Sequence, residues 1–544
     1  KNPDYMKHNY YRYHILFKNP DDMLTIFKDI PFLNGGLFEC LDKAKNDPSN
    51  EKDDPSNEKK DPSKKQKDEI RIDGFSDEVK NQAIFPNFLF FSDGREVDLN
   101  KDYGTTSKKY KVRGLINILQ SYNFTVDENS PIDQDIALDP ELLGKVFENL
   151  LAAYNPETAT TARKSTGSYY TPREIVDYMV DASLKEYLNE KLPNIYQEKI
   201  DWLLSYTQFD ENQKLEFSQE EKNQIIDIID NIKVFDPACG SGAFLMGVLH
   251  KMVHILSIVD PSNEIWKGRL YEKIPDELKN SIENNIGKDE FDYIRKLGLI
   301  EHSIYGVDIQ PIAIQISKLR FFISLLIEQT PDNSLPNRGI IPLPNLETKL
   351  IAANTLIGLD MEGGDNSKLK TQKYNRIKVK TPEVENLELQ IKNINSKIFY
   401  VSNHSAKLSL QEKDKKLKKL LKDALENAGL LKSTADQIAK FDPYNQNATA
   451  DWFDPEWMFG VTDGFDIVIG NPPYGLKFSD DEKEYFKKQY LCTKTIPGKQ
   501  KGSLDSFSLF IEKGFNILKK NGILIYIVPI SITSSDSMTA LHNL

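Results

Sequence analysis

The second half of the chain alternates short apolar segments with longer segments of helical periodicity, and this alternation constrains the fold most. Strands are expected over residues 232–235, 305–309, 350–357, 465–469 and 523–528, with helices over 243–258, 311–328 and 503–518. Parallel strands need crossover connections of this kind, usually helical. The pattern therefore predicts an α/β protein built on a doubly wound, mostly parallel sheet.

The first of these strands runs into a glycine-containing turn, Asp236-Pro-Ala238-Cys-Gly240-Ser-Gly242, that opens a helix. Glycines let the backbone approach a ligand closely at this edge of an α/β sheet. A dinucleotide fingerprint needs a third glycine where Leu245 stands, and a phosphate-binding P-loop needs a Lys-Ser/Thr pair that is missing. Asp236 can instead accept a hydrogen bond from a cationic amine, which suits a zwitterionic ligand. A tight strand-to-helix turn is the alternative interpretation.

The next strand ends in Tyr305-Gly-Val-Asp308-Ile309. An acidic residue at this place commonly binds ribose hydroxyls. It is also a frequent helix N-cap, and Pro311 fits the first turn of such a helix. Its position one strand–helix unit after the glycine turn favours ligand binding.

The catalytic strand candidate, which begins at Phe465, delivers Asn471-Pro472-Pro473-Tyr474 to the same edge of the sheet. The two prolines fix the backbone and remove two N–H donors, so carbonyl acceptors are left pointing outward. The Asn471 side-chain oxygen and the Pro472 carbonyl can then receive both hydrogens of a planar NH₂ group. Tyr474 offers a ring for stacking on the heterocycle that bears this group.

Together these segments resemble the adenine-N6 DNA methyltransferases that use S-adenosylmethionine, and within them the methyltransferase region of type IIG restriction–modification enzymes. The resemblance implies a Rossmann-like methyltransferase sheet in which Asn471, Pro472, Pro473 and Tyr474 are catalytic. It also implies a cofactor site formed by two groups of residues. One surrounds the methionine and ribose portions and comprises Tyr169, Thr171, Asp236, Ala238, Gly240, Gly242 and Asp308; the other surrounds the adenine and comprises Ile309, Asn354 and Phe510.

The order of the motifs, with cofactor motifs first and the catalytic motif last, is typical of the gamma group, whose target recognition domain follows the catalytic domain. The resemblance implies direct methyl transfer to an adenine flipped out of double-stranded DNA. No metal participates in that mechanism, and the seven histidines are dispersed along the sequence.

The resemblance also suggests a division of the chain. We expect a helical connector over 1–135 with a disordered Asp-Pro-Ser repeat loop at 46–68, and a helical region over 136–230 that carries the amino-terminal cofactor motif. The cofactor-binding half of the α/β domain follows over 231–360, a helical insertion over 361–450, and the catalytic half over 451–544. Six insertion lysines, between Lys413 and Lys422, are expected on a solvated face rather than on DNA.

Composition limits the remaining possibilities. The net charge of −12 would ordinarily count against a nucleic-acid partner, and 39% hydrophobic residues favour a globular protein. Three cysteines are too few for a disulfide scaffold, so a reducing cytoplasm, bacterial or archaeal, is expected. The longest apolar run, residues 522–529, is too short for a membrane helix, so no membrane association is expected.

The chain begins at Lys1 and has only five recognisable strands, where the family sheet has seven. We therefore expect an internal fragment of a larger enzyme, without its recognition and nuclease domains. Two alternatives stay open. One is methylation of another planar nitrogen, such as a protein glutamine or an RNA adenine. The other is a non-catalytic scaffold between nuclease and recognition domains.

Overall fold

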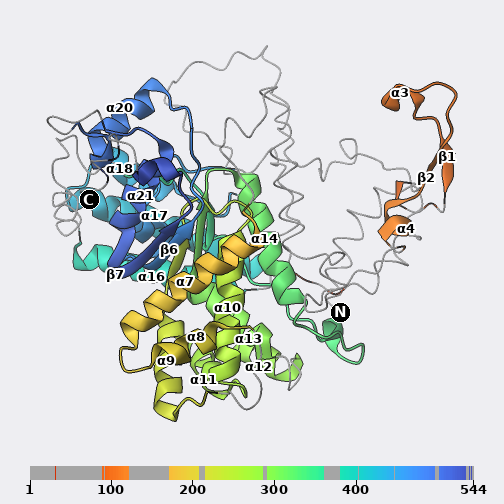
Figure 1. Cartoon of the computed structure of the whole chain (residues 1–544), viewed down its shortest axis with the longest axis horizontal. Helices are drawn as coiled ribbons and strands as arrows, with labels where there is room; N and C mark the ends of the chain where they lie inside the picture. The colour runs from red at the N-terminus through yellow and green to blue at the C-terminus, as the bar shows by residue number, and fades with distance from the viewer. Residues whose placement is uncertain are drawn as a thin grey trace. The chain divides into compact units, whose positions relative to one another are not determined.

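The structure, a computed structural model, describes residues 94–119, 171–206, 215–285, 291–359, 380–401, 404–445, 448–495 and 502–533, with a few isolated positions besides. The chain separates into two compact units, residues 1–137 with 331–342 and residues 138–330 with 343–544. Figure 1 labels many of the elements of both units. The repeat loop at 46–68, most of residues 1–88 and residues 122–170, which include the predicted cofactor residue Tyr169, lie outside the described residues.

The larger unit is built on a parallel sheet with the strand order β5-β4-β3-β6-β7. The strands are β3 (Val234–Asp236), β4 (Ile304–Asp308), β5 (Leu350–Ala352), β6 (Phe465–Gly470) and β7 (Leu518–Tyr526). All five lie where the apolar runs predicted strands, which confirms the doubly wound α/β fold class. The last strand begins earlier than expected, and Asn521 within it has a φ of 64°.

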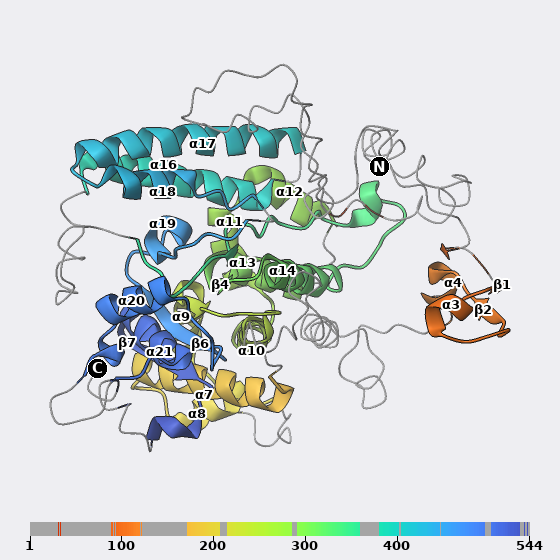
Figure 2. The same cartoon turned by 90° about the horizontal axis from the view of Figure 1, so that it is seen from above.

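Helices cover both faces of this sheet, as Figure 2 shows from above. On one side lie α7 (Arg173–Lys191) and α10 (Ala243–Val259); on the other lie α16 (Pro382–Tyr400), α17 (His404–Asn427) and α18 (Lys432–Lys440). The second side is filled by side chains of three strands, Phe235, Val307 and Val468, packed with apolar residues of the three helices. Phe235 stacks on Phe465 with ring centroids 4.5 Å apart. The alternation of side chains along each strand thus gives the sheet two buried faces.

Further helices complete the larger unit. They are α8 (Gln197–Leu204), α9 (Gln219–Asn231), α11 (Glu264–Lys273), α12 (Asp276–Asn285), α13 (Phe291–His302), α14 (Pro311–Leu326), α19 (Pro455–Phe459), α20 (Asp480–Gln489) and α21 (Ser506–Ile517). Helices α10, α14 and α21 match the expected helices closely. Within the described residues, none of the helices has the length and apolar character needed to cross a bilayer.

The helices α16, α17 and α18 belong to an excursion of the chain between β5 and β6. The excursion closes where it began: the Ala450 N–H donates to the Ala352 carbonyl at 2.9 Å, and the Asn354 N–H donates to the Ala450 carbonyl at 2.8 Å. Ala353 and Ala450 form a parallel bridge at this point. Helices occupy part of the range expected for the insertion, and the domain boundaries, those of the insertion included, stay predictions.

Several lysines of α17 are engaged within the protein. Lys418 is only 9% exposed and donates to the Phe441 carbonyl at 2.9 Å. Lys422 pairs with Asp436 at 2.6 Å. The expectation of a uniformly solvated lysine face is therefore wrong for Lys418, because its stem lies along the leucine-rich side of the helix and its ammonium finds a buried acceptor.

The smaller unit contains an antiparallel pair of strands, β1 (Arg95–Val97) and β2 (Tyr110–Val112), with α3 (Asn100–Tyr103), α4 (Leu115–Leu119) and a 3₁₀ turn at Pro336–Gly339. The Asn100 side chain accepts the Lys108 N–H at 2.9 Å and so fixes the connection between the strands. A mostly helical region was expected around these residues, and that expectation is corrected over 95–112. Polar turn residues, rather than apolar periodicity, determine the local structure there.

Candidate active site

Three of the predicted site residues lie at the carboxyl ends of neighbouring strands. Asp236 ends β3, Asp308 ends β4, and Asn471 follows the last residue of β6. β3 is the central strand and pairs with both β4 and β6, so the sheet brings these residues to one edge. This edge is where doubly wound folds bind their ligands.

The turn after β3 has the conformation that its glycines allow. Gly240 and Gly242 have φ values of 51° and 81°, a region that other residues rarely adopt. The Ser317 hydroxyl of α14 donates to the Gly240 carbonyl at 2.7 Å, and a Cβ on Gly242 would lie 3.0 Å from the same hydroxyl oxygen. The turn is therefore packed tightly against α14 and presents its backbone to the edge of the sheet.

Asp308 holds this turn in place. Its Oδ2 accepts the Gly240 N–H at 3.0 Å, and its Oδ1 accepts the Gln310 N–H at 2.8 Å. Burial raises the pKa of Asp308, against the lowering effect of these two hydrogen bonds. A carboxylate has about four acceptor sites, so two remain for a ligand. The Asp308 carboxylate thus stabilises the turn and still has acceptor sites for a ligand.

Asp236 is almost completely buried, with 1% of its surface exposed. Its Oδ1 accepts the Ala238 N–H at 3.0 Å. Burial raises its pKa well above the usual range, and the Asp308 carboxylate raises it further, while no cation of the described residues lowers it. A buried carboxylate without a cation is costly, and a cationic ligand would offset that cost.

The side chain of Asn471 is anchored at one end and free at the other. Its Nδ2 donates to the Thr171 hydroxyl at 3.2 Å, and its buried Oδ1 has no hydrogen-bond partner among the described residues. The described residues donate no hydrogen bond to the Pro472 carbonyl either. The two acceptors that the sequence predicted for a planar NH₂ group are therefore both available.

The backbone after Asn471 is held by the start of α21. The Ser506 hydroxyl donates to the Pro473 carbonyl at 2.5 Å, and the Gly475 N–H donates to Asp505 Oδ1 at 3.3 Å. Tyr474 packs against the apolar cluster that contains Phe510. The catalytic motif candidate is thus fixed from outside its own strand.

The three residues predicted to contact the cofactor adenine, Ile309, Asn354 and Phe510, differ in their surroundings. Phe510 is buried and shares a cluster with Leu356, against which Ala238 packs. Asn354 lies just after β5, where the chain begins its excursion to the insertion, and its Oδ1 accepts the Leu356 N–H at 3.2 Å. Ile309 is 54% exposed, and its carbonyl accepts the Thr449 hydroxyl at 3.1 Å. Phe510 and the Asn354 partner Leu356 belong to one apolar cluster, whereas Ile309 is not among the described members of this cluster.

Three further residues at this edge were not identified from the sequence. Ser506 and Gly470 contact the catalytic motif and Asp236 respectively. The Tyr526 hydroxyl is buried without a partner among the described residues, and the charge of Asp236 contributes to raising the pKa of Tyr526. Gly470 and Tyr526 are register partners on β6 and β7. The one sequence signal for Gly470 and Tyr526 is their position at the ends of predicted strands.

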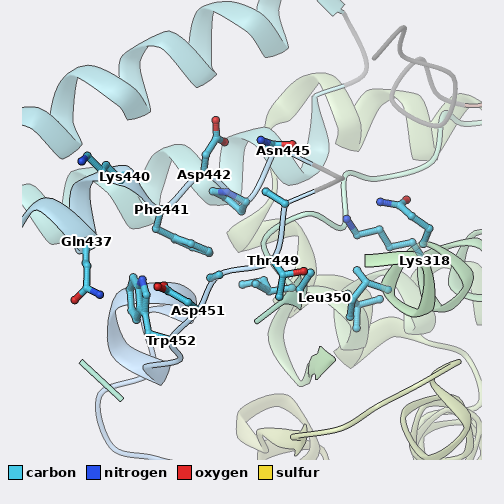
Figure 3. A pocket seen from close by; sticks show the side chains of 17 residues that line it. Lys318, Leu350, Gln437, Lys440, Phe441, Asp442, Asn445, Thr449, Asp451 and Trp452 are labelled. Atoms are coloured by element: carbon cyan, nitrogen blue, oxygen red, sulfur yellow. The ribbon is translucent and has the colours of Figure 1, made fainter. Parts of the chain in front are cut away.

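A cavity of about 330 Å³ lies between α14, β5 and residues of the stretch from Phe441 to Trp452 (Figure 3). Lys318, Phe441 and Trp452 line it, together with Leu350 and Thr449. None of the four residues of the catalytic motif contributes to it. The cavity therefore belongs to the junction of the sheet with the insertion rather than to the edge that carries Asn471.

Other kinds of chemistry find little support at this edge. The described residues contain no group of three or more His, Cys, Asp or Glu side chains arranged to hold a metal ion. Burial raises the pKa of the Cys239 thiol well above its usual range, so a thiolate nucleophile is disfavoured. Burial also lowers the pKa of His250 to about 3, which leaves this histidine neutral.

Comparison with known proteins shows what the carboxyl-terminal part of the chain is similar to. Residues 302–544, which include Asp308 and Asn471, match the family of Eco57I restriction-modification methylases. This part of the chain is similar to restriction-modification methylases. The resemblance that the motifs suggested is thereby confirmed at the level of restriction–modification methylases.

Curated relatives extend the likeness to the amino-terminal side. A protein of Methanocaldococcus jannaschii, named as a type II restriction enzyme and methyltransferase, is 24% identical over 516 residues, 84% of this chain and 40% of the relative. The adenine-specific methyltransferase BrxX of Escherichia coli is 24% identical over 380 residues, 65% of this chain and 26% of the relative. A type II methyltransferase of Thermus thermophilus is 29% identical over 103 residues, 16% of this chain. The chain thus spans less than half the length of the first two relatives.

Proposed function

We propose that the protein is a site-specific DNA adenine-N6 methyltransferase that uses S-adenosylmethionine and forms part of a restriction–modification enzyme of type IIG. The observation that carries this proposal is the buried, unpartnered Oδ1 of Asn471 at the end of β6, next to an unoccupied Pro472 carbonyl acceptor. The methylase family match and the adenine-specific relative support the same conclusion.

The residues of the sheet edge fit the cofactor. Asp236 is a buried carboxylate that lacks a cation, as a site for the ammonium group of the methionine portion requires. Asp308 keeps free acceptor sites for ribose hydroxyls, and Phe510 offers an apolar surface for the adenine. S-adenosylmethionine, when bound, supplies an electrophilic sulfonium methyl group. Residues of the neighbouring strands β3 and β4 and of the helix α21 would therefore hold it.

The chain's own residues would position the target base. Asn471 Oδ1 and the Pro472 carbonyl would accept the two hydrogens of the adenine amino group, which raises the electron density on N6 and orients its lone pair. Tyr474 would stack on the base. Such a site accelerates the reaction through orientation and fixed dipoles, and N6 gives up one proton after the methyl group has been transferred.

A duplex adenine must leave the base stack to reach such a site, so base flipping is part of the proposal. The recognition and nuclease functions are proposed to reside in other parts of a longer enzyme, since the relatives are longer than this chain. The negative charge of −12 is compatible with this division, because phosphate contacts would come mainly from the recognition part.

The decisive experiment measures tritium transfer from labelled S-adenosylmethionine to long unmethylated duplex DNA by the full-length protein, followed by nucleoside analysis. We expect N6-methyladenine as the product. Asn471→Ala should reduce the rate by about 100-fold or more, because one fixed hydrogen-bond acceptor is removed from the reacting group. Cofactor affinity, measured by calorimetry, should stay close to that of the wild type.

The alternatives give different outcomes in the same experiment. Label on protein or RNA rather than DNA would assign the site to another planar nitrogen. Unchanged methylation by Asn471→Ala, or a folded full-length protein that does not bind S-adenosylmethionine, would assign the domain a scaffold role.

A further inference from the structure

Thr171 and Asn471 are separated by 300 residues in the sequence and meet at the sheet edge, where Asn471 Nδ2 donates to Thr171 Oγ1 at 3.2 Å. Thr171 is 7% exposed. It directly precedes Pro172, whose carbonyl accepts the N–H groups of Ile175 and Val176 at 3.1 Å and so begins α7. The hydroxyl is therefore held at a defined point by a rigid helix start.

The two ends of an asparagine side chain are chemically opposite, since the nitrogen only donates and the oxygen only accepts. A threonine hydroxyl can accept from the nitrogen or donate to the oxygen, so it fixes the plane of the amide; in the observed arrangement Nδ2 faces Thr171 and the oxygen is directed away from it. In this protein the oxygen so directed is buried and unpartnered among the described residues. Turned by half a rotation, the amide would present two hydrogens where the proposed substrate also presents two, and no hydrogen bond could form.

The backbone of the motif is fixed independently of Thr171. Ser506 and Asp505, at the start of α21, bind the Pro473 carbonyl and the Gly475 N–H. The Ile527 N–H donates to the Gly470 carbonyl at 3.2 Å, which fixes the approach from β6. These contacts leave rotation of the Asn471 side chain as the freedom that Thr171 removes.

We propose that Thr171 is a positioning residue for methyl transfer: its hydroxyl holds the Asn471 amide with Oδ1 directed at the amino group of the target base. The inference rests on the proposed function of Asn471 and adds to it. The amino-terminal motif would then serve the catalytic step as well as cofactor binding, and couple α7 to the end of β6.

The test compares Thr171→Val, which keeps the shape and removes the hydroxyl, with Thr171→Ser, which keeps the hydroxyl. In the full-length protein we expect Thr171→Val to lower kcat by about 10- to 100-fold, an effect larger than any change in the KM for S-adenosylmethionine. Thr171→Ser should restore most of the rate. Thr434→Val removes a hydroxyl from a fully buried threonine of α18 and serves as the matched control for loss of stability.

A parallel loss of cofactor affinity in calorimetry, with unchanged kcat, would make Thr171 a cofactor contact and overturn the inference. Crystal structures of the wild type and Thr171→Val give a readout that does not depend on activity. A rotated or disordered Asn471 amide in the variant is expected, and an unchanged amide would also overturn it. A wild-type protein that orders the amide through Thr171 but methylates no DNA would contradict the proposed function alone.

Discussion

The Asp236 carboxylate lies directly against the backbone of Gly470: a Cβ built on this glycine would stand 2.7 Å from Asp236 Oδ1. These residues end neighbouring strands, β3 and β6. The last residue before the catalytic motif therefore has no side chain for a steric reason, and the two halves of the site are in contact at this point.

Gly470→Ala should push the Asp236 carboxylate out of position. We expect the affinity for S-adenosylmethionine to fall by about 10- to 100-fold, equivalent to roughly 1–3 kcal/mol for overpacking a buried contact. Calorimetry measures the affinity, and circular dichroism confirms the fold. Gly268→Ala is the matched control, since a Cβ there meets nothing within 4 Å on α11. Equal affinities for Gly470→Ala and the wild type would contradict the packing argument.

Cofactor binding should depend on pH through Asp236. The carboxylate must be ionised to pair with an ammonium group, and burial raises its pKa well above the usual range in the free protein. Affinity should therefore fall as the pH is lowered towards this raised pKa, at a higher pH than an exposed aspartate would give. Calorimetry at several pH values measures the dependence. Asp236→Asn should bind weakly and lose this part of the pH dependence; an unaltered pH profile in Asp236→Asn would assign the titration elsewhere.

Ser506→Ala should slow methyl transfer without abolishing it. The variant leaves the Pro473 carbonyl without its 2.5 Å hydrogen bond and so loosens the backbone of the catalytic motif. A lost buried hydrogen bond costs about 1–3 kcal/mol, so we expect kcat to fall by roughly tenfold. Ser508→Ala is a matched control two residues further on, because its hydroxyl is equally buried but bonds to Ser503. Single-turnover rates that are the same for both variants would argue against a special role for Ser506.

The packing of α16 against α13 should depend on the protonation of Glu301. Burial raises the pKa of this carboxyl to about 7, and nearby Lys349 lowers it only in part. Ser396 donates to it at 2.7 Å, and Tyr400 donates to its other oxygen. His302 beside it is neutral, because burial lowers the pKa of that ring to about 3.

The folded protein therefore binds a proton at Glu301 that the unfolded chain has already released between about pH 4.5 and 7. Through this group, the free energy of unfolding should decrease as the pH rises across that window. Glu301→Gln should flatten the dependence and stabilise the protein at pH 7.5 by ~1–3 kcal/mol relative to the wild type. Urea unfolding at pH 5.5 and 7.5 measures this. Exposed Glu264→Gln is the control, and an equal pH slope in the wild type and Glu301→Gln would contradict the assignment.

Apolar runs and turn residues predict much of this fold. The strands β3, β4 and β6 follow from buried segments such as 465–470, because parallel strands covered on both faces read as continuous apolar sequence. The hairpin of β1 and β2 was missed because it depends on the Asn100 side chain. Helices α11, α12 and α13 were not assigned, because their apolar residues are mixed with charges such as Arg295 that the fold buries.

For the site, too, some features could be predicted from the sequence and others could not. Asp236, Asp308 and Asn471 could be identified because each follows a strand that the sequence makes recognisable. The contacts that position them could not be identified: Thr171 was expected to contact the cofactor rather than Asn471, and Ser317 reaches Gly240 across 77 residues. Such contacts depend on tertiary packing, and a hydroxyl gives no sign in the sequence of which carbonyl or amide it will meet.

The neck formed by Ala352, Asn354 and Ala450 has an evolutionary consequence. The chain leaves and rejoins the sheet at one place, so the free-energy cost of closing this excursion varies only slowly with its length. Helices between the two ends can then be gained, lost or exchanged without displacing Asn471 on the far side of β3. Related methylases should consequently vary most in this stretch, and a graft of one insertion into another enzyme would have its attachment points already defined.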